Sequence, residues 1–411
     1  MYLASMFHRE RLFRIVLRWF GDRVEPGDGR CVTELFLYEF VVSGGTVRRF
    51  VGDVLQAVST DAPRLRRFLL KDELRRAIVE AAVNPAPRVQ ELFRLFAQRP
   101  EEFFPRTPTN LVVATRPDGR LAGMIRFKSI RRLAEKASRR IADRLADEIR
   151  GTALTLAESR ARTAGVPLAQ LVSSPDQMAE EFASAERIVS HSFKDQRLVF
   201  EPHHMRIDDM IGIKFVGTPE ELERIERAVR SHPCAQVVER QVHEGSYCDV
   251  QLLVELQLPS VADIIAAQRT RDWSQAEGRG LSAQELADDF PGFVEAGART
   301  FRCEIILTTF DELVESEFGR SMHEERIIQQ RTAAPYRGRI ARNASYLVEY
   351  LLMLAISPTT DISALPVKMW GRYLEDAFSA AIWMLFGVPY RQGLTGALEL
   401  EIGRELDRLH V

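Results

Sequence analysis

Two acidic residues stand at the edges of strand-like segments and carry the most informative chemistry in the sequence. Asp209 lies in Met205–Val216 and Glu304 in Phe301–His323, and each segment contains the apolar run of a buried strand. Carboxylate oxygens are the ligands that Mg²⁺ prefers, and Mg²⁺ bound with substrate phosphates supports phosphoryl-type transfer. The pair predicts a Mg²⁺ site in which Asp209 and Glu304 act as catalytic residues and as metal ligands.

Both carboxylates also have ordinary structural interpretations, which the sequence leaves open. Asp209 could cap or salt-bridge the start of a strand, and Glu304 could form a cross-strand ion pair beside Arg302. A further polar group, formed by His203, His204 and Asp208, resembles a metal site. It lacks another ligand at metal spacing, so a polar loop is the simpler interpretation.

Composition excludes several classes of protein. The 411 residues are 45% hydrophobic and 28% charged with a formal net charge of −2, so no overall field attracts DNA or a membrane. The four cysteines form no Cys-x-x-Cys pair, which fits reduced thiols in a cytosol. The first residues lack a signal-peptide pattern, and the apolar runs are shorter than the roughly 20 residues that cross a bilayer. We therefore expect a cytoplasmic protein with no membrane and no DNA partner.

The order of expected elements predicts an α+β fold, in which a mixed β-sheet domain is flanked by N-terminal and C-terminal helical regions. Four regions follow from this order: a helical N-terminal region, a region with a hairpin and long charged helices, a sheet domain with a helical insertion near 260–296, and a C-terminal helical extension. Their respective bounds are 1–105, 106–185, 186–325 and 326–411. The C-terminal helices are expected to close the fold or to form the face of a homo-oligomer.

Local signals place the elements before the sheet domain. Ser43-Gly44-Gly45 is expected to end a helical segment, and Ala62–Ala82 is expected to be helical. Leu111–Ala114 and Leu121–Phe127 are expected to form a hairpin around a Pro-Asp-Gly turn. The mixed-sign charges of Ser129–Thr163 predict a long solvated helix.

Signals in the later part of the chain indicate alternating strands and helices. Thr218 followed by Pro-Glu-Glu predicts the start of a helix. Tyr247–Leu258 and Arg302–Thr308 are expected to be strands, whereas the stretch that begins at Val238 is expected to be a loop. The P-loop and dinucleotide-binding glycine patterns are absent from the sequence.

At these strands the chain resembles the synthetase domain of RelA/SpoT-type alarmone synthetases, over about a third of its length from about Arg187 to His323. Three motifs carry the resemblance, in the family's order and spacing: Asp209-Met-Ile-Gly-Ile-Lys214, Tyr247-Cys-Asp-Val-Gln-Leu-Leu-Val254 and Glu304-Ile-Ile-Leu-Thr-Thr309. The resemblance implies a nucleotidyltransferase-like domain that moves pyrophosphate from ATP to the 3′-hydroxyl of GDP, GTP or a related acceptor. The 3′ end of a tRNA is a further acceptor that it implies.

The resemblance also assigns roles to residues. Asp209 would be the Mg²⁺ ligand, Glu304 would complete the metal site or activate the 3′-hydroxyl, and Tyr247 would stack on the guanine. Further nucleotide-binding residues are then expected at Lys214, Arg240 and His243. For ATP, the family's Arg-x-Lys, Ser and Lys pattern has two matches. The preferred one, which needs no insertion, is Arg187, Lys194 and Arg197, and the other is Arg126, Lys128, Ser129 and Lys136.

Several positions depart from the family pattern. Asp249 and Gln251 stand where the family has Ser and His, and Ile306 and Thr308 stand where it has Gln and Arg. Fewer cations compensate less of the charge on a triphosphate. The departures favour a second hypothesis, in which the chain is a catalytically degenerate nucleotide-binding or protein-interaction module that regulates a partner.

Overall fold

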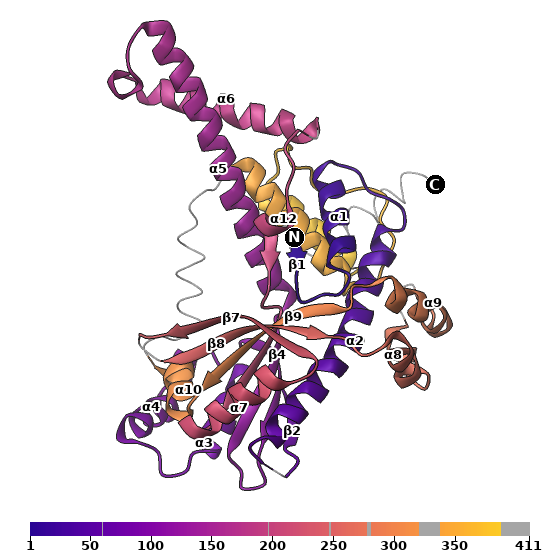
Figure 1. The fold of residues 1–411 in the computed structure, drawn as a ribbon. Coiled ribbons are helices and arrows are strands. Elements are labelled where there is room, and N and C mark those ends of the chain that lie inside the picture. The colour runs from indigo at the N-terminus through magenta and orange to yellow at the C-terminus, as the bar shows by residue number, and fades with distance from the viewer. Residues whose placement is uncertain (60, 196, 246–247, 278–280, 320–337, 388–411) are drawn as a thin grey trace, which may run out of the picture.

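A seven-stranded mixed sheet forms the centre of the computed structural model, which describes residues 1–59, 61–195, 197–245, 248–277, 281–319 and 338–387 (Figure 1). The strand order is β2-β3-β4-β6-β9-β8-β7. In chain order the strands are β2 (Arg64–Leu70), β3 (Pro108–Thr115), β4 (Leu121–Phe127), β6 (Ile211–Val216), β7 (Ala235–His243), β8 (Asp249–Gln257) and β9 (Thr300–Thr308). A separate two-stranded pairing joins β1 (Tyr2–Leu3) to β5 (Arg206–Ile207).

The central strands β6 and β9 run parallel, whereas the other described neighbours in this sheet are antiparallel. Alternation along each strand separates the two faces. On β6, Ile211, Ile213 and Phe215 are buried on one face, so Gly212 and Lys214 lie on the other. This second face of the sheet carries the candidate site.

The helices in the first half of the chain are α1 (Arg9–Phe20), α2 (Asp28–Gln56), α3 (Lys71–Glu80), α4 (Pro87–Gln98), α5 (Ile130–Ala164) and α6 (Pro175–Lys194). The later helices are α7 (Pro219–Ser231), α8 (Val261–Gln268), α9 (Ala283–Ala296), α10 (Phe310–Phe318), α12 (Arg339–Leu354) and α13 (Glu375–Leu385). The mixed sheet and its helical flanks confirm the expected α+β fold class. None of the described helices combines the length and apolar character needed to cross a bilayer.

Two hydrophobic cores hold the layers together. The larger core joins Ile213 and Ile305 of the sheet to α1, α2, α5 and α12. The smaller core packs α3, α4 and α10 over part of the other face, where Leu111 and Met124 contribute from β3 and β4. The rest of that face is left open, and the cleft described below lies there.

Several local expectations are confirmed. The hairpin forms as β3 and β4, and the long charged helix forms as α5. The Ser129 side chain accepts a hydrogen bond from the Arg132 amide at the start of α5, and Gly165 ends the helix with a φ of +68°. Thr218 caps α7 in the same way. Figure 1 shows α5 and α6 projecting away from the sheet.

Three stretches differ from expectation. The helix that was expected to end at Ser43-Gly44-Gly45 continues as α2, because its buried residues pack in the larger core and outweigh the poor helix propensity of glycine. Ala62–Ala82 is not one helix: β2 precedes α3, since Phe68 packs in the smaller core beside Leu111 of β3. The expected loop after Val238 lies in β7, an edge strand paired with β8.

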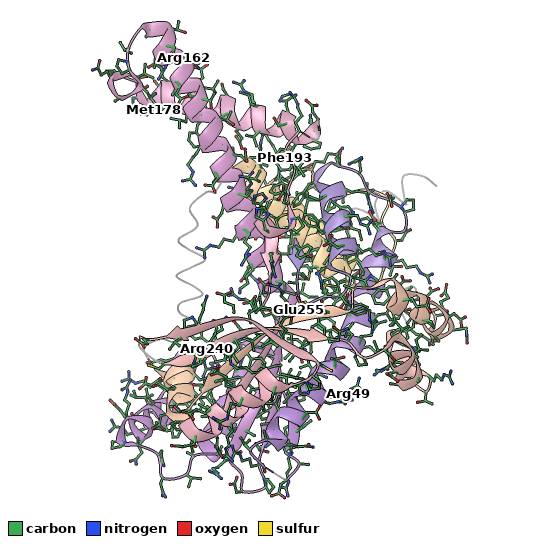
Figure 2. The ribbon with its side chains drawn as sticks, in the orientation of Figure 1. Arg49, Arg162, Met178, Phe193, Arg240 and Glu255 are labelled. Atoms are coloured by element: carbon green, nitrogen blue, oxygen red, sulfur yellow. The ribbon has the colours of Figure 1, made fainter. Side chains whose placement is uncertain are left out.

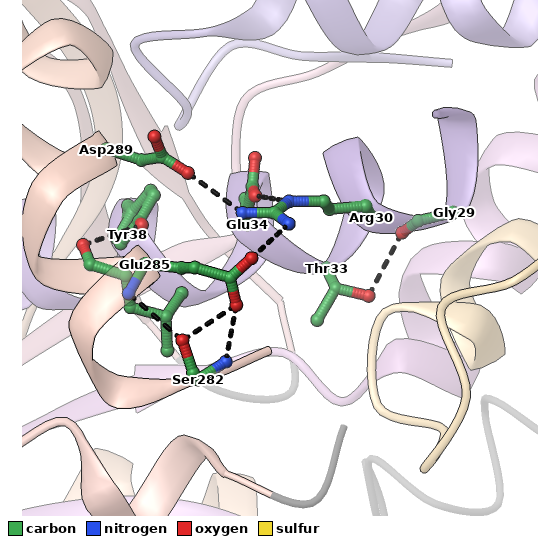
Figure 3. Close-up of polar contacts among 9 residues, drawn as sticks. Gly29, Arg30, Thr33, Glu34, Tyr38, Ser282, Glu285 and Asp289 are labelled. Carbon is green, nitrogen blue, oxygen red and sulfur yellow. Dashed lines mark hydrogen bonds and ion pairs between the residues drawn. The ribbon is translucent and has the colours of Figure 1, made fainter. Parts of the chain in front are cut away.

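The helical insertion near 260–296 is anchored by charge. Arg30 of α2 donates to Glu285 at 3.0 Å and to Asp289 at 2.9 Å, and both acceptors lie on α9 (Figure 3). Nearby, the Tyr38 hydroxyl donates to the Leu286 carbonyl. At the other end of the chain, α12 packs its apolar face along α5, whereas α13 leaves Trp383 and Met384 partly exposed. The expected role of these helices in oligomerisation stays a prediction.

Candidate active site

A cleft of about 520 Å³ opens on the second face of the sheet. Strands β4, β6, β8 and β9 supply its floor, while α3, α5, α10 and the end of β7 supply its walls. The lining contains six lysine and arginine side chains and five carboxylates: Lys71, Arg126, Lys128, Arg132, Lys136, Lys214, Asp209, Glu244, Asp249, Glu304 and Glu317. This density of charge marks a site for a polar, multiply charged ligand.

Asp209 and Glu304 lie in this one cleft. Asp209 comes just before β6 and Glu304 lies on β9, and the parallel register of the two strands pairs Gly212 with Glu304. Gly212 adds no side chain between them, and a Cβ atom there would lie 3.8 Å from Glu304 Oε2. The parallel pairing therefore brings the two acidic groups to the same face.

Two lysines hold the Asp209 carboxylate. Lys128 and Lys136 both contact Asp209 Oδ2, and the Lys128 ammonium also donates to the Asp209 carbonyl at 2.7 Å. Burial by itself would raise the pKa of Asp209, but the two ammonium groups outweigh burial and lower that pKa to about 2. Asp209 is consequently an anion throughout the physiological range.

The environment of Glu304 has the opposite effect. Burial raises the pKa of Glu304 above its usual value; the field of Lys128 opposes this rise, and the field of Asp209 adds to it. The Gln251 amide donates to Glu304 Oε1 at 2.5 Å, which fixes one carboxylate oxygen and leaves Oε2 beside Gly212. The two carboxylates therefore differ electrostatically: the pKa of Asp209 is lowered, whereas the pKa of Glu304 is raised.

The cations of the cleft divide into paired and unpaired groups. Lys71 donates to Glu317 at 2.7 Å, and Arg132 pairs with Glu135 on its own helix. Within the described part of the chain, Arg126 and Lys214 have no hydrogen bond or ion pair of their own. Burial lowers the pKa of Lys214, while the field of Glu317 acts against that decrease. Arg126 and Lys214 are therefore available to an anionic ligand.

Of the further residues expected to bind the nucleotide, only some lie at the cleft. Lys214 and His243 line the cleft, and His243 Nδ1 lies 2.7 Å from Asp249 Oδ1. Arg240 does not reach the cleft, because its register opposite Leu252 turns it to the other face, where it pairs with Glu226 of α7 (Figure 2). Tyr247 lies outside the described residues.

The preferred ATP-side cations do not line the cleft, and their part in ATP binding stays a prediction. Arg187 donates to Ser184 on exposed α6, Lys194 stacks over the Trp370 ring, and Arg197 pairs with Asp195. The other match supplies Arg126, Lys128 and Lys136 to the cleft, with Ser129 as the cap of α5. The long insertion that this match requires includes the α5–α6 hairpin and precedes Asp209.

The second metal-like pattern of the sequence, at residues 203–208, is held by contacts among its own side chains. In the part of the chain that the structure describes, no three His, Cys, Asp or Glu side chains are grouped as ligands of one metal ion. The His203 and His204 ring centroids lie 3.9 Å apart with the ring planes tilted by 44°, and Asp208 pairs with Arg206. His203 and His204 belong to a short 3-10 helix, Pro202–Met205, and β5 follows it.

The donor set nevertheless fits Mg²⁺ bound together with a phosphate ligand. Mg²⁺ commonly takes one or two carboxylates and completes its shell with water and substrate phosphates. Asp209 and Glu304 provide that number of carboxylates, and the cations around them favour phosphate. Asp209 and Glu304 would hold the ion.

The fold and the cleft define an α+β protein with a carboxylate- and cation-lined site on the face of a mixed sheet. No protein-family model matches the chain, and no curated protein sequence matches it. Among solved structures it is similar to small alarmone synthetase 2 from Bacillus subtilis, with 13% identity and a TM-score of 0.19 over 42% of this chain and 70% of that one. It is also similar to small alarmone synthetase 1 from Bacillus subtilis, with 12% identity and a TM-score of 0.18 over 40% and 68% of the two chains.

Proposed function

We propose that this chain transfers pyrophosphate from ATP to the 3′-hydroxyl of a guanosine nucleotide or a related acceptor such as the 3′ end of a tRNA. The observation that carries the proposal is that Asp209, just before β6, and Glu304, on the neighbouring parallel strand β9, line one cleft with six lysine and arginine side chains. The type of reaction is inferred from the three motifs that resemble RelA/SpoT-type synthetases.

The cations that contact Asp209 suit the donor. Lys128 and Lys136 are held at Asp209, and Arg132 projects from the same helix as Lys136. When a triphosphate binds, its oxygens would replace Asp209 as the partner of the two lysines, so the charge in the cleft would stay compensated. Mg²⁺ at the two carboxylates would neutralise charge on the phosphates. Arg126 and Lys214, which have no ion pair among the described residues, would receive the remaining phosphate charge.

Glu304 would either complete the metal site or act as the general base, and as the base it would leave Mg²⁺ to Asp209. In the reaction, the acceptor 3′-oxygen forms a bond to the β-phosphorus of ATP, the bond from that phosphorus to the α–β bridging oxygen breaks, and AMP leaves. The proton of the 3′-hydroxyl goes to Glu304. A base works best when its pKa lies near the operating pH, and burial raises the pKa of Glu304 in that direction.

A second candidate function is nucleotide binding without turnover. The two lysines already neutralise Asp209, and Gln251 and Ile306 occupy positions where the resembling family has His and Gln. In that case the cleft would sense a nucleotide and the helical flanks would transmit its presence to a partner.

Transfer of label separates the two functions. Pure protein is incubated with Mg²⁺, ATP labelled at the γ-phosphate, and GDP, GTP or tRNA. We expect one acceptor to gain label, and Asp209→Asn to reduce the rate by at least about 100-fold, whereas Asp147→Asn on the exposed face of α5 leaves it unchanged. Nucleotide binding by calorimetry with no labelled product would support the second function, and an active Asp209→Asn variant would exclude the first.

A further inference from the structure

A second, smaller hollow lies further along the same strands as the cleft. Its volume is about 290 Å³, and its lining includes three arginines from three different elements, together with His203 and Glu255: Arg9 of α1, Arg206 of β5 and Arg302 of β9. We call this hollow the arginine crevice. Glu255, labelled in Figure 2, lies on β8, and the strand pairing places it directly opposite Arg302.

The arginine crevice shares a sheet face with the cleft. Residues two apart on a strand point to the same side, so Arg302, Glu304 and Ile306 form one row on β9. Glu304 and Ile306 line the cleft, whereas Arg302 lines the arginine crevice. One step in this row is about 7 Å. That step is comparable with the reach of one sugar–phosphate unit of a nucleotide.

Charged side chains lie between the cleft and the arginine crevice. A hollow of about 190 Å³, lined by Asp208, Asp209 and Glu304 among others, lies next to the cleft. Asp208 accepts from Arg206 Nε at 2.7 Å and lies 3.7 Å from Arg302 Nη1. Asp208 therefore holds two of the arginines while it lines the passage toward Glu304.

Among the side chains that line the arginine crevice, three are arginines and one, Glu255, is a carboxylate. Arg302 pairs with Glu255 at 3.1 Å and shares Asp208 with Arg206. Arg9 is positioned by the carbonyls of Met6 and Thr300, which hold the guanidinium without neutralising it. Asp208, Glu201 and Glu10 contact lining residues without lining the crevice themselves. Each arginine has five N–H donors and the contacts above use few of them, so donors are left for a phosphate.

We propose that the arginine crevice binds a phosphate on the 5′ side of the ribose whose 3′-hydroxyl is placed at Glu304. This inference rests on the proposed function and adds a requirement on the acceptor: a nucleotide is accepted and a nucleoside is not. The phosphate is either the 5′-phosphate of a mononucleotide or the preceding linkage of an RNA 3′ end. In both cases it competes with Asp208 for Arg206 and Arg302.

Binding of acceptors in the absence of ATP and Mg²⁺ tests the inference independently of turnover. The probes are guanosine, GDP and a short oligoribonucleotide, with affinity measured by calorimetry for the full chain. We expect GDP or the oligoribonucleotide to bind at least about tenfold more tightly than guanosine. Tighter binding of GDP identifies the mononucleotide as the source of the phosphate, and tighter binding of the oligoribonucleotide identifies RNA.

Variants assign the phosphate to its site. Arg302→Gln and Arg206→Gln should each weaken the phosphate-bearing probe by about tenfold and leave guanosine unchanged, with Arg269→Gln, an exposed arginine after α8, as the matched control. Arg206 is the more exposed of the two arginines, so a folded Arg206→Gln protein keeps the test valid if Arg302→Gln does not fold. Equal affinity for guanosine and the phosphate-bearing probes, or wild-type affinity in both variants, would overturn the inference. Arginine-dependent binding without any transfer would remove the proposed function and keep the phosphate site.

Discussion

The ammonium group of Lys136 contacts the carboxylate of Asp209, which lies 73 residues later in the chain. Lys136 lies in the second turn of α5, and Asp209 lies two residues before the start of β6. Since β4 and β6 are neighbours in the sheet, the start of α5 after β4 lies beside the start of β6. The contact shows that the α5–α6 hairpin is inserted between two strands that are neighbours in the sheet. The proposed role of Lys136 in ATP binding can therefore be tested against that of Arg187.

Neutralising Lys136 should weaken ATP binding. We expect Lys136→Gln to raise the Kd for ATP by about 10- to 100-fold, because it removes a charge-assisted contact in the cleft. Arg187→Gln should have no effect, since Arg187 lies on exposed α6 and contacts Ser184. Calorimetry with ATP measures both variants. The reverse result, in which Arg187→Gln alone weakens binding, would restore the match at residues 187–197.

The charge of Lys128 should give ATP binding a dependence on alkaline pH. Burial lowers the pKa of Lys128 to about 8, against the attraction of Asp209. The ammonium form, which binds phosphate, is therefore lost as the pH rises through about 8, and affinity should fall there. Lys128→Arg should flatten this decrease, because guanidinium stays protonated in this range. Binding measured from pH 6.5 to 9.5 compares the two proteins, and parallel curves would argue against Lys128 as the titrating group.

The buried pair Lys71–Glu317 should be costly to break from one side. Both side chains are nearly buried and join α3 to α10 at the wall of the cleft. We expect Lys71→Met to lower the free energy of unfolding by about 3–5 kcal/mol, because Glu317 would be left as a buried unpaired charge. The double variant Lys71→Met/Glu317→Leu should recover most of this loss. Urea unfolding measures both, and equal losses in the single and double variants would contradict the expectation.

The same pair should contribute to acid sensitivity. Burial opposes ionisation of Glu317, but Lys71 and Lys214 lower its pKa to about 2. The unfolded chain takes up a proton near the ordinary glutamate pKa of about 4.5, so the stabilisation is complete above that pH and is lost as the pH falls toward 2. Glu317→Gln should be less stable at neutral pH and should lose less stability between pH 4.5 and 2. Thermal unfolding across this range would reveal an unchanged slope if Glu317 plays no part.

The turn of the β3–β4 hairpin should be held by one bidentate ion pair. Arg116 donates to Glu221 Oε1 at 2.6 Å and to Oε2 at 3.0 Å, and both side chains are largely shielded from solvent. We expect Arg116→Gln to cost about 1–2 kcal/mol, more than the usual exposed pair. Arg120→Gln is the matched control, because its partner Asp118 is exposed, and should cost less than about 0.5 kcal/mol. Similar losses for both variants in urea unfolding would show that the pair does not fix the hairpin.

The sequence by itself determined the local features of this protein. Ser129, Gly165 and Thr218 marked helix ends correctly, because capping depends on residues within one turn. The strands that carry Asp209 and Glu304 were also predictable, since alternation and apolar runs are local. Local rules failed at Gly44-Gly45 and at β2, where burial in the two cores overrode propensity.

Only the tertiary structure decided which charges share a site. Sequence spacing favoured Arg187, Lys194 and Arg197 because they lie close to Asp209 along the chain, yet the fold sends them onto α6 and the segment after it. Strand pairing instead brings in Lys128, Lys136 and Lys71 from far earlier in the chain. Register also sends Arg240 to the opposite face. The physical reason is that Coulomb interaction depends on distance through space, which strand order and register set and which separation along the sequence does not.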